Sequence, residues 1–383
     1  MYTAENALLK CVTECRLDGM TINELKNEIE FAIFPERTTG ETKGMDGKSK
    51  VDSSKLVANR FRRTASTKNP KNRKSYMCTL RRLQAFVGEE KFEELTFEDI
   101  NLDWLKDWEL FMAKTSPSQN ARNVHHRNFR AVINDAIAND VTTNYPYRKF
   151  KLARQTTRHR DLTVEEIRQV IFYPCQKTVE KYRDMFVLSF ILMGVNFKDL
   201  YELTDKVVFR GRLVFDRSKT NYPYSMLIVP EAQALINKYK GKNGQLLYIK
   251  SDCNDIDEYV RRTNRALRKV GPYDVVNKHG KTIYYPLFKD ITTYWARHSW
   301  ATIAGTLEIP KETVSCALGH SIGSTITDIY MKPYYAKVDR ANRAVLDWVL
   351  YGKKEGVEVV KPGTPEFFGL TKSQFEDLGF DKI

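Results

Sequence analysis

Near the end of the chain, three short motifs bring together residue types that can act on a phosphate ester. Arg297 lies in Tyr-Trp-Ala-Arg-His-Ser-Trp, which begins at Tyr294. His320 follows in Leu-Gly-His-Ser, and Tyr330 comes ten residues later. The arginine fork binds two phosphate oxygens and stays charged, and the histidine can donate a hydrogen bond or exchange a proton. A tyrosine phenol, with a pKa of about 10, needs neighbouring cations to become a nucleophile. We therefore expect these residues to share one catalytic site.

Two upstream positions fit the same chemistry. Lys219 lies between two predicted strands, 212–215 and 224–229, where a lysine on a hairpin can protonate a leaving oxygen as a general acid. Asn196 lies at the end of a predicted helix, and its amide donates a hydrogen bond without bringing charge. Attack on a phosphodiester gives a multiply negative transition state, which fixed positive donors stabilise without a metal ion. The sequence has no metal-ligand spacing and no phosphate-loop or dinucleotide glycine motif, so we expect no metal and no cofactor.

Together these motifs resemble the C-terminal signature of the tyrosine recombinases of the phage-integrase type. That family has an arginine followed by histidine or serine and an aromatic residue, then Leu-Gly-His, then a tyrosine at a similar distance. The resemblance covers about residues 55–345. It implies that Tyr330 forms a 3′-phosphotyrosine intermediate, with Lys219 as the general acid and Arg297 and His320 at the phosphate. It also implies a homotetramer on double-stranded DNA that exchanges strands through a Holliday junction, and it leaves open whether accessory DNA-bending proteins take part.

Two positions depart from the family pattern. Asn196 stands where the family has its first arginine, and Tyr294 stands where it has the histidine of His-x-x-Arg. Loss of one donor to a developing negative charge costs about 3–4 kcal/mol of transition-state stabilisation. We therefore expect another cation to reach the phosphate. The sequence leaves four candidates open, namely Arg183, Arg210, Arg212 and Arg217.

The composition indicates a polyanionic partner. Among 383 residues, 62 are Lys or Arg and 48 are Asp or Glu, which gives a net charge of +14 and a pI near 9.3. This surplus favours DNA over the rival, an anionic membrane surface, because no apolar run is long enough to span a bilayer. The six cysteines form no Cys-x-x-Cys pair, which favours a reducing cytoplasm. We expect a bacterial cytoplasmic protein that is associated with the nucleoid when it is bound to DNA.

Amphipathic helices predict a small all-helical DNA-binding domain at 52–145. One basic face follows Lys55, and a second lies on the helix near 118–139. We expect both faces to contact the phosphate backbone, because one side of each helix is apolar and the other is basic. The candidate DNA-binding residues on these faces are Arg60, Arg62, Arg63, Lys71, Arg73, Lys74, Arg122, Arg127 and Arg130.

The remaining sequence divides into four segments. Residues 1–50 form a helical segment, which the resemblance relates to the arm-type DNA-binding domain of some integrases. Residues 146–160 are basic and broken by proline, as in an interdomain linker. The catalytic domain is expected at 161–349. A tail, 350–383, carries apolar residues around Phe367 that dock either on a neighbouring protomer or back in cis.

We therefore expect a mainly α protein with a small antiparallel β-sheet, in which a helical SAM-like core-binding domain precedes a tyrosine-recombinase catalytic domain. The two domains would embrace the duplex from opposite sides. One alternative is a non-catalytic DNA-binding protein, because Trp300–Leu307, the Glu308–Pro310 turn and Glu312–Leu318 are compatible with a helix-turn-helix. A type IB topoisomerase would use the same chemistry without a specific site. Covalent trapping on DNA separates the enzymes from the binding protein.

Overall fold

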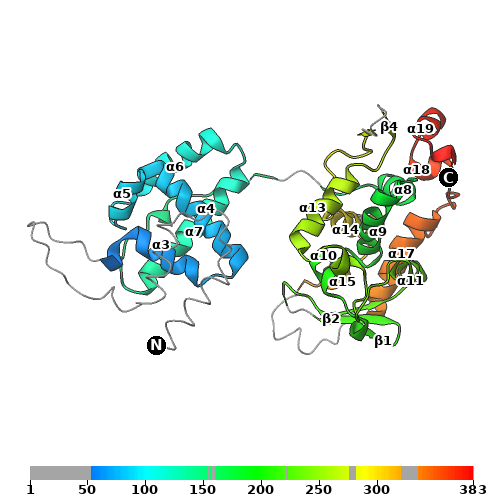
Figure 1. Ribbon diagram of the computed structural model, residues 1–383, viewed down its shortest axis with the longest axis horizontal. Helices are drawn as coiled ribbons and strands as arrows, with labels where there is room; N and C mark the ends of the chain where they lie inside the picture. Colours follow the sequence, from blue (N-terminus) through cyan, green and yellow to red (C-terminus); the bar gives the residue numbers. More distant parts are fainter. Residues whose placement is uncertain are drawn as a thin grey trace, which may run out of the picture. The chain divides into compact units, whose positions relative to one another are not determined.

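The computed structural model forms two compact units, residues 1–157 and residues 158–383. It describes residues 53–153, 155–156, 160–220, 223–275, 282–320 and 335–382. Both units consist mainly of helices, and the described strands form two small antiparallel sheets (Figure 1). This confirms the expected mainly α class with a small antiparallel sheet. No helix within the described ranges is long and apolar enough to cross a membrane.

The first unit packs its helices around an aromatic core. The described α-helices are α3 (Val57–Ser66), α4 (Pro70–Val87), α5 (Glu89–Glu94), α6 (Leu102–Thr115) and α7 (Gln119–Ala138). Phe61, Trp108 and Phe129 are fully buried at its centre. The Trp108 and Phe129 rings meet edge to face, with their centroids 5.5 Å apart. Tyr147, in the segment expected to be a linker, is also buried in this core.

Local sequence explains where these helices begin. The side chain of Asn69 accepts a hydrogen bond from the Asn72 amide, and Pro70 occupies the first turn of α4, where no amide hydrogen is needed. The helix ends at Gly88, whose φ of 94° suits glycine. In the second unit, Thr163 and Glu166 form the capping box at the start of α8.

The second unit is built around α9 (Lys177–Ile191), which is buried from Arg183 to Ile191. Helices α8, α11, α13 and α14 pack against it. The other described α-helices of this unit before its tail are α8 (Val164–Phe172), α10 (Phe197–Glu202), α11 (Pro230–Lys238), α12 (Ile249–Asp252), α13 (Ile256–Leu267), α14 (Trp295–Thr306), α15 (Lys311–Ala317) and α17 (Tyr335–Tyr351). A helix buried on all sides provides a rigid support for the elements around it.

The three-stranded sheet contacts α17 through β3 and lies at the lower end of the second unit in Figure 1. Its strands, in spatial order, are β1 (Val208–Phe209), β2 (Arg212–Asp216) and β3 (Pro223–Leu227), all antiparallel. Leu213 on β2 lies opposite Met226 on β3, and both side chains are buried. A separate hairpin pairs β4 (Tyr273–Val275) with β5 (Thr282–Tyr284). Because side chains alternate along a strand, Tyr224, two residues before the buried Met226 on β3, faces the same buried side of the sheet.

The C-terminal tail folds back in cis. Helix α18 (Pro365–Phe368) packs against α8, and α19 (Lys372–Asp377) packs against α18. Both are red in Figure 1, and Phe367 is fully buried. The buried Arg168 of α8 donates to the carbonyl oxygens of Trp348, Val349 and Phe367, at 2.6, 3.1 and 2.8 Å. Of the two arrangements that the sequence left open for the tail, the structure has the intramolecular one.

Candidate active site

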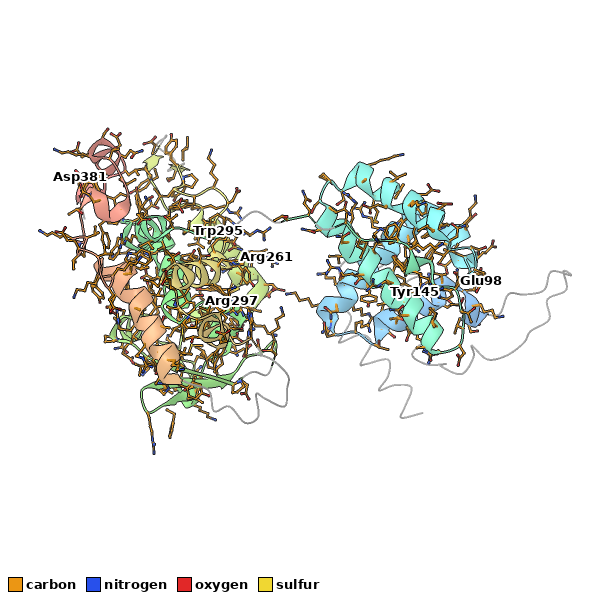
Figure 2. The ribbon with its side chains drawn as sticks, turned by 180° about the vertical axis from the view of Figure 1, so that it is seen from behind. Glu98, Tyr145, Arg261, Trp295, Arg297 and Asp381 are labelled. Atoms are coloured by element: carbon orange, nitrogen blue, oxygen red, sulfur yellow. The ribbon has the colours of Figure 1, made fainter. Side chains whose placement is uncertain are left out.

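Arg297 lies at the centre of the candidate site. It is in the first turns of α14, which packs on α9, and its side chain is 5% exposed (Figure 2). Its Nη1 donates to the carbonyl oxygen of Gly194 at 3.2 Å, and its Nη2 donates to that of Leu318. Nη2 also lies 3.2 Å from Nε2 of His320. The expected pairing of Arg297 with His320 therefore appears in the geometry.

The turn after α9 lets α14 approach closely. Gly194 has a φ of +74°, and a Cβ on it would lie 2.4 Å from Cα of Arg297. Only glycine fits this position. Asn196, Tyr294 and Arg297 line one small pocket of about 30 Å³ next to this turn. The structure thus brings these three predicted residues together, although Tyr294 is half exposed and stacks edge to face on His298.

His320 sits among cations. Arginine has no acceptor, so the contact with Arg297 assigns Nε2 as the acceptor and places the ring proton on Nδ1. Burial lowers the pKa of His320, and the charges of Arg297, Arg217 and Lys219 lower it further. The ring is therefore neutral at neutral pH. The cations that act on it come from two segments, Arg297 on α14 and Arg217 and Lys219 just after β2.

Lys219 is exposed in the turn that follows β2. The backbone amide of the preceding residue, Ser218, donates to Oδ1 of Asp199 on α10 at 3.0 Å. Asp199 is 3% exposed, so this hydrogen bond fixes the base of the turn to the core. The side chain of Lys219 is left in solvent, as a residue that must reach a bound substrate requires.

Tyr224 on β3 holds the site together, and the sequence did not single it out. Its hydroxyl donates to the Leu318 carbonyl oxygen at 2.8 Å and lies 3.5 Å from Nη1 of Arg297. Its ring also packs so closely on Gly319, which has a φ of +61°, that a Cβ there would lie 2.7 Å from it. The signal that points to Tyr224 is its inward position in the alternating strand.

The remaining predicted catalytic residue, Tyr330, lies outside the described residues, as does the 1–50 segment. The site described above therefore consists of the groups that would bind and activate a phosphate.

Two of the predicted DNA-binding residues are interior ion-pair partners. Arg60 is 8% exposed, and its Nε lies 2.6 Å from a carboxylate oxygen of Asp135. Arg122 is equally buried and is held 2.8 Å from Glu109. A phosphate contact would have to compete with these ion pairs. That Arg60 and Arg122 contact DNA stays a prediction.

The other predicted DNA-binding residues lie at the surface. Arg62 is exposed but forms a bidentate pair with Glu93, with one contact at 2.8 Å. Arg73 is half-buried. The other exposed members are Arg63, Lys71, Lys74, Arg127 and Arg130. Each of the two basic faces therefore presents cations to solvent.

Part of the chain matches a known protein family. Residues 54–152 match the model of the phage integrase SAM-like domain. A comparison with curated protein sequences finds no match. The match to the family model falls on the helical first unit and spans α3 to α7.

Solved structures match a larger part of the chain. A lambda integrase dimer bound to a COC′ core site is similar with a TM-score of 0.53 and 15% identity, over 83% of this chain and 87% of that one. A lambda integrase tetramer bound to a Holliday junction gives 0.53 and 16%, over 78% and 88%. The Tn1549 transposon integrase in complex with a circular intermediate DNA gives 0.50 and 16%, over 74% and 99%. At these identities the likeness establishes the fold.

Proposed function

We propose that this chain, which shares its SAM-like domain and its fold with the tyrosine recombinases of the phage-integrase type, is a site-specific DNA recombinase. The fold class expected from the sequence motifs, a helical SAM-like domain followed by a catalytic domain, is confirmed by these likenesses. One observation carries the functional proposal. Nη2 of Arg297 lies 3.2 Å from Nε2 of His320, and the charge of Lys219 acts on the same imidazole ring. Such a cluster of donors fits a phosphodiester in its transition state.

The reaction follows from the chemistry of these groups. A non-bridging oxygen of the scissile phosphate binds the Arg297 guanidinium, and His320 donates a hydrogen bond through Nδ1. The phenol of Tyr330 loses its proton to water, its oxygen attacks phosphorus, and the bond to the 5′ oxygen breaks. Lys219 gives its proton to that leaving oxygen. The resulting 3′-phosphotyrosine keeps the energy of the phosphodiester, so a 5′ hydroxyl from another strand can reverse the step without ATP.

The DNA contacts are part of the same proposal. The exposed residues Arg63, Lys71 and Arg130 of the first unit contact phosphates. In the second unit, Arg265 on α13 and Arg268 just after it are also exposed and are candidates for phosphate contacts there. Four protomers act on two sites, as in the lambda integrase tetramer bound to a Holliday junction.

The alternative, a non-catalytic helix-turn-helix protein, is less well supported. Helix α15 is the segment that would read the major groove, and it is a single short helix of 7 residues. Val314 and Cys316 on it pack against the core, and Ala317 is buried. Too little of this helix is left at the surface to contact several bases.

The experiment that separates these functions is covalent trapping. The full chain is incubated with a duplex that carries its attachment site, with a nick placed so that the released fragment diffuses away. A recombinase is expected to leave a protein–DNA adduct that survives denaturing electrophoresis. A chain that shifts the same duplex in a native gel but never forms the adduct would support the binding protein instead.

The protonation state of His320 predicts a pH dependence of cleavage. Because the pKa of His320 is lowered, the ring stays neutral well below the usual value of about 6.5 and gains a proton only in more acidic solution. Protonation places a proton on Nε2, opposite the Arg297 guanidinium, and breaks their hydrogen bond. Below neutral pH, we expect the single-turnover cleavage rate to fall as the pH drops through the lowered pKa of His320.

The matched variant is His320→Gln, whose amide oxygen can still accept from Arg297 but does not titrate. Its cleavage should be slower and should lack the acidic fall. An acidic fall of equal size at the same pH in this variant would assign the titration to another group.

A further inference from the structure

The proposed reaction leaves one charge unaccounted for. Asn196 occupies the position where the family resemblance places an arginine, and its side chain lines the pocket beside Arg297. An amide cannot neutralise a phosphate oxygen. If the chain cleaves DNA as proposed, another cation must reach the phosphate, and the second unit offers four arginines near the site in sequence.

Two of these arginines are committed to structural roles. Arg183 is buried, pairs with Asp184 at 2.7 Å, and donates to the Tyr173 carbonyl oxygen at 2.9 Å beyond the end of α8. Arg212 pairs with Asp339 on α17 at 2.7 Å and donates to Ser225 at 2.8 Å. Freeing either would break an ion pair that is largely shielded from water, at a substantial cost in stability.

A third, Arg210, lies away from the cluster. It forms the β1–β2 turn with Gly211, with a φ of +49°, and its side chain is exposed. Its guanidinium carbon lies 5.0 Å from the ring centre of Phe209 in the same turn.

Arg217 differs from all three. It directly follows β2 and is 5% exposed. Its Nη1 donates to the Gly319 carbonyl oxygen at 3.1 Å, while Arg297 binds the carbonyl oxygen of the preceding residue, Leu318. The two guanidinium groups therefore hold consecutive carbonyls immediately before His320. Within the described part of the chain, the Nε of Arg217 has no hydrogen-bond partner, although it is buried.

An unsatisfied donor on a buried guanidinium is costly unless a ligand completes it. The charge of Arg217 also acts on the His320 ring together with those of Arg297 and Lys219. The amide of the next residue, Ser218, is anchored to Asp199, which fixes the backbone between Arg217 and Lys219. The side chain is thus buried, positioned and short of one partner.

We propose that Arg217 is the second phosphate-binding arginine of this site and supplies from the end of β2 the charge that Asn196 does not. It is a catalytic residue in the strict sense, because its free Nε–H donates to a non-bridging oxygen of the scissile phosphate. Arg297 and Arg217 then hold the phosphate from two sides, and Asn196 adds a neutral hydrogen bond. This inference rests on the proposed recombinase function.

The test measures single-turnover cleavage of the nicked attachment-site duplex by the full chain. Arg217→Ala should lower the cleavage rate about a hundredfold and change the affinity for the duplex by less than about twofold. Arg210→Ala, which removes an exposed charge from the neighbouring turn of the same sheet, is the matched control and should cleave at the wild-type rate. Asn196→Arg in the Arg217→Ala background should recover part of the lost rate, because it places a guanidinium in the pocket beside Arg297.

A second substrate separates a catalytic role from a structural one. In a duplex whose scissile phosphate is a methylphosphonate, one charged oxygen is replaced by a methyl group, so one cation is no longer needed. The defect of Arg217→Ala should shrink to less than about tenfold on this substrate. This comparison also decides the matter if Arg217→Ala melts early, because Arg217→Lys, which keeps the buried charge, can be measured on both substrates in the same way.

Three outcomes overturn the inference. If Arg217→Ala cleaves the natural phosphate at a rate within about threefold of wild type, Arg217 has no catalytic role. The same follows if the defect of this variant is equally large on both substrates. In either case the proposed recombinase function is unaffected. A wild-type chain that forms no adduct at all contradicts the proposed function, and the inference fails with it. The reaction with the wild-type chain therefore distinguishes failure of the inference about Arg217 from failure of the proposed function.

Discussion

Arg297→Ala should lower the rate of DNA cleavage by about two to three orders of magnitude, which corresponds to about 3–4 kcal/mol of lost transition-state stabilisation. The reason is that the Arg297 guanidinium is 5% exposed and fixed by the carbonyl oxygens of Gly194 and Leu318 before any substrate arrives. A preorganised charge in a buried site needs no reorganisation during the reaction. Single-turnover cleavage of the attachment-site duplex measures the effect.

Arg297→Lys is the informative companion variant. Lysine keeps the charge, but its donors share one nitrogen and cannot span two carbonyls and a phosphate as the guanidinium fork does. The variant should therefore retain less than about a tenth of the wild-type rate. Both variants should retain DNA affinity within a few-fold, because most of the binding comes from backbone contacts elsewhere. Wild-type cleavage by Arg297→Ala would remove this residue from the reaction.

Arg168→Ala should reduce the free energy of unfolding of the second unit by about 3–5 kcal/mol. Arg168 is 2% exposed and satisfies the carbonyls of Trp348, Val349 and Phe367. Burial lowers its pKa to about 10, which still leaves it charged at neutral pH. The alanine variant strands three buried acceptors and leaves a cavity beneath α18.

Denaturant unfolding of the full chain measures this loss, and limited proteolysis should show earlier cutting of the tail. The control is Lys250→Ala, because the pair between Lys250 and Glu202 is largely in solvent and should contribute at most about 1 kcal/mol. Equal stability of Arg168→Ala and wild type would show that the tail is not anchored through this residue.

Sequence patterns predicted the elements that carry the site well. The capping box at Thr163 marks the start of α8, and the two strands expected around Lys219 are β2 and β3. These signals are local, because a cap or an alternating strand is encoded within a few residues. That Arg297 and His320 belong to one site was also expected, although in that case from the family resemblance.

The roles of individual arginines could not be predicted in this way. In the sequence, Arg60 and Arg122 belong to helix faces that look basic. Only the fold shows that each forms an ion pair with a carboxylate from another helix, Arg60 with Asp135 on α7 and Arg122 with Glu109 on α6. Arg217 was one of four equal candidates until its position next to Gly319 separated it from the others. Ion pairing between distant segments leaves no periodic signal in a sequence.

The most direct test of the account is to identify the residue that carries DNA in the trapped adduct. After nuclease and protease digestion, mass spectrometry should find a nucleotide linked to the phenolic oxygen of Tyr330, and Tyr330→Phe should bind the duplex yet form no adduct. An adduct that persists in Tyr330→Phe and maps to Tyr334 or Tyr335, or to a residue other than tyrosine, would contradict the proposed mechanism.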